Sequence, residues 1–506
     1  MSHTQIQSGA HARIDDPLLE QAKRAPHKPA VVEGDRSCTY DELAARARHL
    51  AAQLQRRGLE PGDRVSIYLD KTTPSVVALY GVWLAGGVAV PVNEGLRSRQ
   101  IEHIVRHSES RLFISDPRKL ARLDPGAVAG ADVLEVEEGV DRAHSPPARR
   151  GGREPAAILY TSGSTGRPKG ILLSHENLLA GARIVARYLE IRHDERIISI
   201  LPFSFDYGLN QLLTTVATGA TLFLQRSHFP ADIHRSLARY EITGMAGVPP
   251  LWKQLLTEGS PLSQAALPHL RYITNSGGVF PTELVAHCRR VLPATRLYLM
   301  YGLSEAFRST YLPPEELERR PGSMGRAIPE TEIHVLDEHG RECGPGAVGE
   351  LVHRGPTVAL GYWRDPEATA AVFREPPFAP AGSAERVVHS GDLVRRDEGG
   401  YLYFVGRRDQ LIKCQGFRVS PDEVEETIFA SGLVAEVVVH GVPDPVSGQA
   451  IIAHVVPREA GAFSEQALLT YCRREMPSYM VPRAVRAHAE LPRTPSGKLD
   501  RKGLAG

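Results

Sequence analysis

The stretch 160–169 reads YTSGSTGRPK and brings five hydroxyl side chains, two glycines and a lysine into ten residues. An apolar, β-rich run (AAILY, 156–160) leads into it, and a helix-like segment, HENLLAGARIVARYLE, follows from His175. Backbone N–H groups and hydroxyls in a loop at this position can surround an anion. The stretch is therefore predicted to be a phosphate-binding loop.

Two other interpretations of this loop fit less well. The Walker pattern needs a Gly-Lys pair followed by Ser or Thr, whereas Lys169 follows a proline and precedes Gly170. A flexible Ser/Gly linker is the structural alternative. A linker rarely has a strand directly before it and a lysine beside a proline within it, so an anion-binding loop of another class is expected.

Composition and charge indicate an ordinary globular protein with a small-molecule partner. The 506 residues are 42% hydrophobic and 24% charged, which is typical of a soluble chain with two or more domains. The formal net charge is +1, so no overall field attracts nucleic acid or an anionic membrane. We expect no nucleic-acid partner, and anion binding only at local sites.

The cysteines and the apolar segments favour a cytoplasmic protein without a membrane span. The five cysteines are an odd set without C-x-x-C spacing, which argues against a disulfide framework and a zinc site. The N-terminus lacks the apolar core of a signal peptide. In the apolar run 75–92, Gly86 and Gly87 would end a helix near Ala85. A helix followed by a short buried strand is expected there.

Apolar β-rich runs alternate with helical patterns along much of the chain, as is typical of α/β layers with mostly parallel strands. The runs lie at 65–69, 88–92, 111–115, 156–160, 196–200, 220–224 and 271–275. Residues 118–155 are expected to form a weakly ordered excursion, and 348–403 a β-rich subdomain. The sequence pattern changes after Gly406 to one of small α+β character. We therefore place a domain boundary near Asp409, with a large domain over 1–408 and a small one over 409–506.

Several motifs occur in order along nearly the whole chain. They are TYDEL (39–43), LAGGVAVPV (84–92), LYTSGSTGRPKG (159–170), YGLSEA (301–306), GELVHRG (349–355), SGDLVRRDEGGYLYFVGR (390–407), LIKCQGFRVSPDEVE (411–425) and PRTPSGKLDRK (492–502). This set resembles the adenylate-forming (AMP-binding) superfamily of acyl-CoA synthetases, nonribosomal peptide synthetase adenylation domains and firefly luciferase. The resemblance implies an α/β fold: a large N-terminal domain of two layered α/β subdomains plus a β-barrel, hinged to a small α+β C-terminal domain.

The resemblance also implies an ATP site. Tyr301 would stack on adenine, Asp392 would hold the ribose, and Glu305 would bind Mg²⁺ with phosphate oxygens, the usual way in which proteins bind this ion. The implied nucleotide contacts are Thr161, Ser162, Gly163, Ser164, Thr165, Gly166, Lys169, Ser276, Gly277, Gly278, Tyr301, Gly302, Ser304, Asp392 and Arg407. From the residues alone, Asp392 could also cap a turn and Tyr301 could be a core residue. Ser304 replaces the family's commoner threonine and keeps the hydroxyl.

The catalytic and hinge residues follow from the same resemblance. Lys498 matches the family lysine that contacts both the carboxylate and the α-phosphate, although its local sequence alone would suit a surface lysine. Arg418 would meet the adenylate phosphate in one state. Asp409 occupies the hinge position, and Gly416, which lacks a Cβ, would let the chain pass beside the pantetheine tunnel.

The acyl pocket is expected to contain two opposite charges. Asp206 follows a phenylalanine, as in peptide synthetase domains that hold an α-amino group, and Arg308 matches a second pocket position. Together they favour a polar substrate, such as an amino acid with a second acidic group. The alternative is that they pair with each other and leave an apolar slot. The full set is Asp206, Tyr207, Asn210, Gly247, Ile273, Asn275, Met300, Arg308 and Ser309.

The expected function is an ATP- and Mg²⁺-dependent, AMP-forming carboxylate–thiol ligase. A small carboxylic acid attacks the α-phosphate of ATP and releases pyrophosphate, and a phosphopantetheine thiol then displaces AMP. The sequence ends soon after Lys498, so the thiol is expected to come from CoA or from a separate acyl or peptidyl carrier protein. The alternatives are an acyl-CoA synthetase for a medium-chain or aromatic acid, a non-catalytic nucleotide-binding module, and an oxygenase of the luciferase type.

Overall fold

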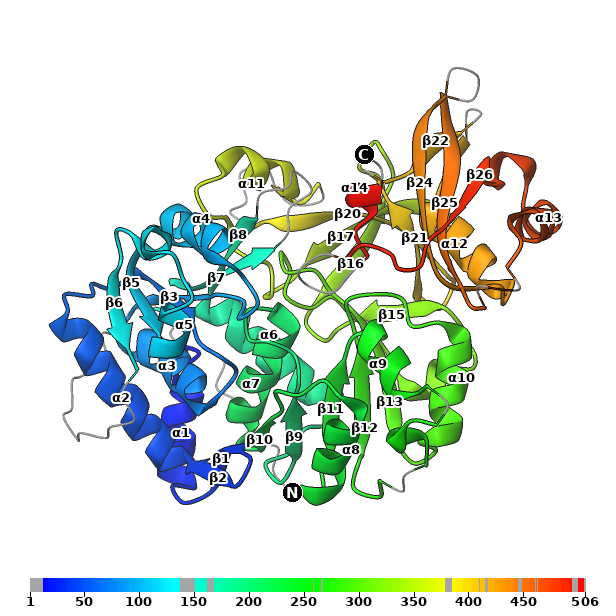
Figure 1. Ribbon diagram of the computed structural model, residues 1–506. Helices are drawn as coiled ribbons and strands as arrows, with labels where there is room; N and C mark the ends of the chain where they lie inside the picture. Colours follow the sequence, from blue (N-terminus) through cyan, green and yellow to red (C-terminus); the bar gives the residue numbers. More distant parts are fainter. Residues whose placement is uncertain are drawn as a thin grey trace. The chain divides into compact units, whose positions relative to one another are not determined.

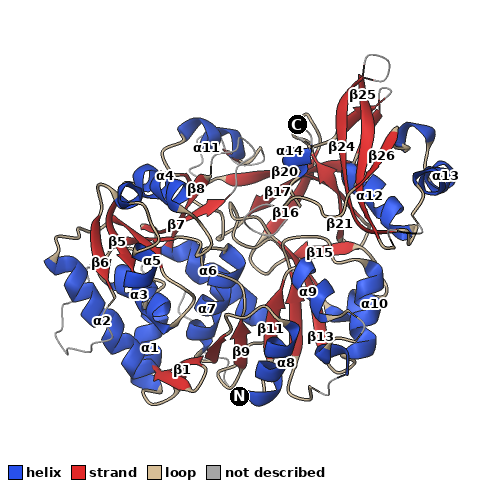
Figure 2. Cartoon of the chain, viewed as in Figure 1, coloured by secondary structure: helices blue, strands red, loops and turns tan. Residues whose placement is uncertain are grey.

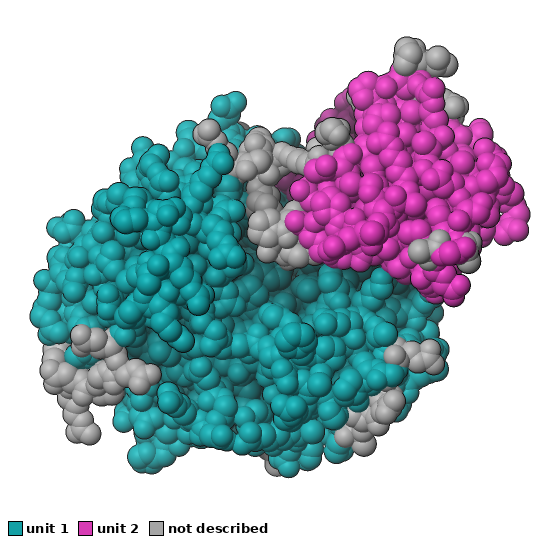
Figure 3. All heavy atoms as spheres, in the orientation of Figure 1, with its two compact units in different colours: residues 1–333, 353–388 teal, residues 334–352, 389–506 magenta. Residues whose placement is uncertain are grey.

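The computed structural model describes residues 12–136, 151–161, 168–257, 259–264, 267–377, 385–408, 410–414, 417–444, 448–459, 461, 463–493 and 499–504. The chain forms two compact units, coloured separately in Figure 3. Unit 1 holds residues 1–333 and 353–388, and unit 2 holds residues 334–352 and 389–506. The expected domain border near Asp409 lies within unit 2 and stays a prediction.

The first sheet of unit 1 has the strand order β18-β8-β7-β4-β3-β5-β6 (Figure 1). β3 pairs in parallel with β4 and β5, whereas β7 and β8 are antiparallel. The bounds are β3 (Arg64–Tyr68), β4 (Val88–Pro91), β5 (Ser110–Ser115), β6 (Asp132–Glu135), β7 (Pro155–Thr161), β8 (Lys169–Ser174) and β18 (Gly361–Tyr362). The strands predicted at 65–69, 88–92, 111–115 and 156–160 are confirmed.

The second sheet of unit 1 has the order β15-β14-β13-β12-β11-β9-β10-β1-β2. Neighbours from β13 through to β1 are parallel, as the buried apolar runs predicted. β14 and β15 add antiparallel neighbours at one side, and β2 does so at the other. The bounds are β1 (Pro29–Glu33), β2 (Arg36–Thr39), β9 (Arg196–Ser199), β10 (Thr221–Leu224), β11 (Gly244–Gly247), β12 (Tyr272–Asn275), β13 (Arg296–Tyr301), β14 (Thr310–Leu312) and β15 (Ser323–Ala327).

Two helices, α6 (His175–Tyr188) and α7 (Asp206–Thr218), lie between these sheets, as Figure 2 shows. Both are buried along almost their whole length. Ser174 caps α6 by accepting a hydrogen bond from the Asn177 N–H at 3.0 Å. The other helices of unit 1 are α1 (Asp16–Arg24), α2 (Tyr40–Arg56), α3 (Thr73–Leu84), α4 (Ser98–Ser108), α5 (Pro117–Leu120), α8 (Pro230–Arg239), α9 (Pro249–Leu255), α10 (Thr282–Val291) and α11 (Pro366–Val372), and α11 precedes the short strand β19 (Phe373–Arg374).

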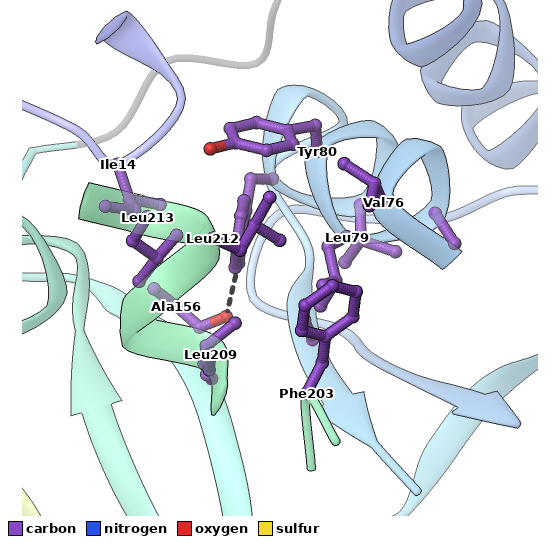
Figure 4. Close-up of a cluster of buried hydrophobic side chains, with 14 of the residues drawn as sticks. Ile14, Val76, Leu79, Tyr80, Ala156, Phe203, Leu209, Leu212 and Leu213 are labelled. Atoms are coloured by element: carbon purple, nitrogen blue, oxygen red, sulfur yellow. Dashed lines mark hydrogen bonds between the residues drawn. The ribbon is translucent and has the colours of Figure 1, made fainter. Parts of the chain in front are cut away.

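The apolar run 75–92 forms a helix and a buried strand, as predicted. α3 stops one residue before Ala85, and Gly86 then takes a φ of +82°, a backbone conformation that glycine adopts readily. Figure 4 shows its Val76, Leu79 and Tyr80 in a buried cluster with side chains from α7. Among the helices that the structure describes, none is both long and apolar enough to cross a bilayer.

Unit 2 contains strands in the order β16-β17-β20-β21 and a separate sheet, β23-β22-β25-β24, in which β26 lies beside β25. The small sheet and helices α12 and α13 share a core that includes Val424, Ile451 and Cys472. The bounds are β16 (Glu332–Leu336), β17 (Val348–Arg354), β20 (Val387–Arg396), β21 (Leu402–Arg407), β22 (Ile412–Cys414), β23 (Phe417–Val419), α12 (Pro421–Ala430), β24 (Val434–Asp444), β25 (Gly448–Pro457), α13 (Glu465–Glu475), β26 (Ala484–Ala487) and α14 (Arg501–Leu504). The predicted α/β fold class is confirmed. The strand pairing of the described residues is an open path, so the barrel stays a prediction.

Two local expectations need correction. Within 118–155, the part up to 136 is built into the first sheet, because β6 pairs in parallel with β5 and Arg57 forms an ion pair with Asp132 at 3.0 Å. Residues 137–150 lie outside the described part. The helix after the phosphate loop begins at His175, as expected, but it does not follow the loop directly. The strand β8 lies between them, and its apolar run is too short to be recognised in the sequence.

Candidate active site

The predicted site residues follow strands that end together at one edge of a sheet. The parallel strands β9, β11, β12 and β13 end at Ser199, Gly247, Asn275 and Tyr301. The carboxyl ends of parallel strands meet at the same edge, which is where open α/β sheets bind ligands. The segments that leave this edge are 200–206, 248, 276–278 and 302–309, and they carry much of the predicted site.

The chain after β13 turns back and buries Arg308. Phe307 has a φ of +55°, which is uncommon for a residue with a side chain, and the Ser309 N–H donates to the Tyr301 carbonyl at 3.2 Å. Arg308 is 2% exposed, and its Cζ lies 4.8 Å from the centroid of the Tyr207 ring. Its Nε and Nη2 have no hydrogen-bond partner among the described residues. Burial of unused donors is costly, so these two nitrogens are suited to an anion.

Asp206 begins α7 at the same sheet edge and is 5% exposed. In the described parts of the chain, no ion pair joins its carboxylate to Arg308. The direct pair that the apolar-slot alternative requires is therefore absent. The residue after Asp206 is Tyr207, and its hydroxyl is hydrogen-bonded to Thr274 Oγ1. Burial raises the pKa of Tyr207, so the phenol is neutral at pH 7.

Two further pocket residues lie at the strand ends. A Cβ on Gly247 would come 2.6 Å from Cε2 of the buried Trp252 ring, so only glycine fits there without a shift. The Asn275 amide donates to the Gly278 carbonyl at 3.2 Å, and Asn275 Oδ1 is buried without a partner in the described structure. Asn275 therefore offers an unused acceptor at the carboxyl end of β12.

The remaining predicted pocket residues are also buried. Met300 accepts a hydrogen bond from the Tyr188 hydroxyl at its sulfur, 3.0 Å away, within a buried aromatic cluster. Asn210 Oδ1 accepts from Thr214 along α7 at 3.4 Å. Ile273 is completely buried in β12. Their contact with an acyl group stays a prediction.

His353 supports the pocket and was missed by the sequence reasoning. Its Nδ1 lies 3.0 Å from Ser309 Oγ, and its Nε2 lies 3.1 Å from Thr357 Oγ1, which donates to the Arg308 carbonyl at 3.3 Å. Burial lowers the pKa of His353 to about 3, so the imidazole is neutral at pH 7. The only signal in the sequence was its place in the motif GELVHRG.

Glu305 and Lys169 meet at a second residue that the sequence reasoning missed, Tyr362. The Tyr362 hydroxyl donates to Glu305 Oε1 at 2.6 Å, and Lys169 Nζ lies 5.1 Å from the centroid of the same ring. Lys169 Nζ is also 4.0 Å from Asp365 Oδ2. Tyr362 pairs with Ile171 of β8, next to the predicted phosphate loop. The predicted Mg²⁺ ligand and the loop lysine therefore share one neighbourhood.

The other predicted nucleotide contacts of unit 1 lie at the ends of strands or in the segments that follow them. Thr161 and Lys169 are paired across β7 and β8, so the two ends of the phosphate loop adjoin. Gly277 has a φ of +82° at the end of β12, and a Cβ on Gly302 would come 3.3 Å from Arg308 Cα. Ser276 and Gly278 flank Gly277, and Ser304 lies in the turn that follows β13. Contact with ATP stays a prediction for all of them. The loop residues Ser162, Gly163, Ser164, Thr165 and Gly166 lie outside the described residues.

In unit 2 the structure brings together the two predicted ribose contacts. Asp392 and Arg407 are directly opposite each other on β20 and β21, and Arg407 Nη1 lies 3.0 Å from Asp392 Oδ1. Asp392 is buried. The preceding Gly391 N–H donates to Glu350 Oε1 at 3.0 Å, which fixes the turn before the aspartate. The ribose role of the pair stays a prediction.

Besides the loop residues, four more predicted residues cannot be placed as side chains. Lys498, Asp409 and Gly416 lie outside the described residues, and Arg418 is described only by its backbone in β23. In the part of the chain that the structure describes, no group of three or more His, Cys, Asp or Glu residues is arranged to hold a metal ion. Mg²⁺ held by Glu305 and phosphate oxygens does not need such a group.

Comparisons with known proteins identify the family models and the proteins that this chain resembles. A family model described as AMP-binding enzyme matches residues 18–363, and one described as AMP-binding enzyme C-terminal domain matches residues 423–498. A long-chain-fatty-acid–CoA ligase from Salmonella typhimurium is 31% identical, with 96% of this chain and 92% of that protein covered. The nonribosomal peptide synthetase asaC from Aspergillus flavus is 32% identical over 95% of this chain, which spans 47% of that protein.

Solved structures with the same fold include two ligand complexes. o-Succinylbenzoate CoA synthetase (MenE) from Bacillus subtilis, bound to its acyl-adenylate intermediate, has a TM-score of 0.87 at 27% identity, covering 97% of this chain and 98% of that one. ATP-bound MatB from Rhodopseudomonas palustris has a TM-score of 0.88 at 29% identity, with 98% of both chains covered. The family predicted from the ordered motifs is thereby confirmed: this chain is an enzyme and belongs to the AMP-binding enzyme family.

Proposed function

We propose that this AMP-binding enzyme is an ATP-dependent acid–thiol ligase that activates a polar carboxylic acid, with an amino acid as the favoured substrate. The observation that carries the choice of a polar acid is Arg308, a buried guanidinium with two unused donors and no ion pair to Asp206 among the described residues. A substrate with an anionic group would complete the hydrogen bonds of Arg308. A substrate ammonium group would do the same for Asp206.

The first half-reaction needs charge stabilisation at the α-phosphate, because a carboxylate must approach another anion. We assign Lys498 and the 161–169 loop to this role. Glu305 fits as the ligand for Mg²⁺, because Tyr362 holds Oε1 and leaves Oε2 without a hydrogen bond among the described residues. When bound, Mg²⁺ neutralises phosphate charge. Tyr362 orients the carboxylate, and Lys169 supplies a positive charge beside it.

The second half-reaction transfers the acyl group to a phosphopantetheine thiol. The matched relatives include a protein named as a CoA ligase and one named as a nonribosomal peptide synthetase, so CoA and a carrier protein are both candidate acceptors. An acyl-CoA synthetase for a medium-chain or aromatic acid is the second candidate function, favoured by the fatty-acid–CoA ligase at 31% identity. The described cysteines are all unpaired thiols, which suits the cytoplasmic location that we propose.

Substrate-dependent ATP–pyrophosphate exchange in the wild type and in Asp206→Asn tests the substrate class. The variant keeps the size of the side chain and removes the charge, so we expect the KM for an amino acid to rise at least about tenfold while the KM for ATP stays the same. Unchanged amino-acid activation would rule out the ammonium role. Mass spectrometry of thioesters formed with CoA or with a phosphopantetheinylated carrier protein identifies the acceptor.

A further inference from the structure

The segment that carries Asp206 is held on its polar side by a buried lysine. Lys71 follows β3 and is 5% exposed. Its ammonium nitrogen donates to the Ile200 carbonyl, and it lies 3.4 Å from the Leu201 carbonyl. These carbonyls stand where the chain leaves β9 and turns toward Asp206. Lys71 therefore fixes the start of the loop 200–205.

The other contacts of this loop leave it little freedom. Phe203 is buried in the core, and in Figure 4 its ring lies beside Leu79 of α3. The Phe205 N–H donates to the Pro202 carbonyl at 3.2 Å. A Cβ on Gly208 would come 2.2 Å from that carbonyl oxygen, so the first turn of α7 lies directly against the loop. Only the lysine supplies polar side-chain contacts to the first two carbonyls among the described residues.

The electrostatic environment of Lys71 allows it to hold the two carbonyls in either protonation state. Burial lowers the pKa of Lys71 to about 7; Glu94 opposes that shift, and Arg226 adds to it. No carboxylate of the described residues forms an ion pair with the Lys71 side chain. A neutral amine keeps two N–H donors and an ammonium has three, so both protonation states can satisfy the two carbonyls. Burial of a lysine is unfavourable, and here the side chain uses its donors on two backbone carbonyls.

We infer that Lys71 is a positioning residue for the acid substrate: it holds the loop 200–205 so that Asp206 is fixed at the carboxyl edge of the sheet. The inference rests on the proposed function, in which Asp206 faces the substrate. Loss of the lysine leaves two carbonyls without their donor and lets the loop shift. A displacement of about 1 Å at a reacting group can reduce the rate about 100-fold.

The test compares Lys71→Met, which keeps the length and apolar stem, with Lys71→Arg, which keeps donors, and with Lys119→Met. Lys119 is a matched control because it is also buried and close by, yet its Nζ pairs with Asp70 at 2.8 Å and does not contact the loop. Asp70 keeps Arg226 as a partner in that variant. ATP–pyrophosphate exchange gives the KM for the acid and for ATP, and hydrogen exchange reports on the peptide 200–209.

We expect Lys71→Met to raise the KM for the acid at least about tenfold with the KM for ATP unchanged, and Lys71→Arg to restore most of the loss. Amide protection over 200–209 should fall in Lys71→Met alone; if that variant is insoluble, Lys71→Gln takes its place. Equal changes in both KM values, or the same loss in Lys119→Met, would overturn the inference. A wild type without acid-dependent exchange would instead refute the proposed function, and unchanged protection in Lys71→Met would still refute the positioning role.

Discussion

Arg308 is predicted to reduce the stability of the protein while it contributes to catalysis. The substitution Arg308→Met should therefore raise the free energy of unfolding and lower kcat/KM. Two unpaired buried donors cost about 1–3 kcal/mol each, and the contact with the Tyr207 ring offsets about 1–2 kcal/mol of this. The net penalty is about 0–5 kcal/mol, which spans the range of about 1–4 kcal/mol in which apolar replacement of buried charges has been stabilising. Methionine has a similar length and needs no partner, so the free energy of unfolding should increase by about that amount.

The same substitution removes two charge-assisted hydrogen bonds to a polar substrate. At about 1.5–3 kcal/mol each, their loss lowers kcat/KM for adenylation by a factor of about 10² to 10⁴. Chemical denaturation gives the stability, and ATP–pyrophosphate exchange gives kcat/KM. Arg308→Lys keeps the charge but not the planar fork, so it should recover only part of the activity.

Arg271 is the control, because its substitution by methionine should lower the free energy of unfolding and not raise it. Arg271 Nε donates to Glu195 Oε1 at 2.7 Å, and the Glu195 side chain is 2% exposed. Arg271→Met leaves that carboxylate buried alone and should cost about 3–5 kcal/mol of stability. If Arg308→Met is destabilised like Arg271→Met, or keeps full kcat/KM, then the guanidinium of Arg308 is satisfied within the protein and the reasoning is refuted.

Three further predictions concern residues around the site. Tyr362→Phe removes the donor to Glu305 and should lower the rate of pyrophosphate exchange about tenfold, at a cost of about 1.5–3 kcal/mol for a charge-assisted hydrogen bond. His353 has a folded pKa of about 3, below its unfolded value of 6.5, so stability should fall as pH decreases from about 6.5 to about 3, by up to about 4 kcal/mol, and His353→Gln should flatten this dependence in denaturation curves. Gly247→Ala places a Cβ 2.6 Å from Trp252 and should cost about 1–3 kcal/mol in chemical denaturation.

Each of these has an outcome that contradicts it. Full exchange activity in Tyr362→Phe would mean that Glu305 is oriented without the phenol. Parallel acid profiles for the wild type and His353→Gln would assign the acid sensitivity to other groups. Gly126→Ala is the control for Gly247→Ala, since nothing lies within 4 Å of a Cβ at Gly126; equal stability losses in both would remove the steric explanation.

Much of the sheet architecture was predictable because buried parallel strands are continuous apolar runs. RIIS (Arg196–Ser199) and YITN (Tyr272–Asn275) stand out from their polar flanks, so both strands could be recognised in the sequence. β6 was missed because its sequence, DVLE, has only two apolar residues between two acidic ones in an Ala- and Gly-rich segment. Its place is set by pairing with β5. β8 was missed for a similar reason: its apolar run is short.

The supporting residues of the site were not predictable from local sequence. Tyr362 reaches Glu305 across 57 residues, and His353 reaches Ser309 across 44. No periodicity or motif spacing predicts contacts of that kind, because they depend on where the fold places His353 of β17 and Tyr362 of β18. The unused donors of Arg308 are also a property of the fold, since the sequence alone left a pair with Asp206 open as an alternative. Only the burial and the hydrogen-bond partners of Arg308 show whether it pairs with Asp206 or keeps unused donors.

The measurement that bears most directly on substrate choice is ATP–pyrophosphate exchange by the wild-type enzyme across a panel that pairs each amino acid with its des-amino acid and includes fatty and aromatic acids. We predict exchange confined to the amino acids, and strongest for those with a second anionic group, because Asp206 and Arg308 do not neutralise each other. Exchange with fatty or aromatic acids, and none with amino acids, would contradict the proposal and identify an acyl-CoA synthetase.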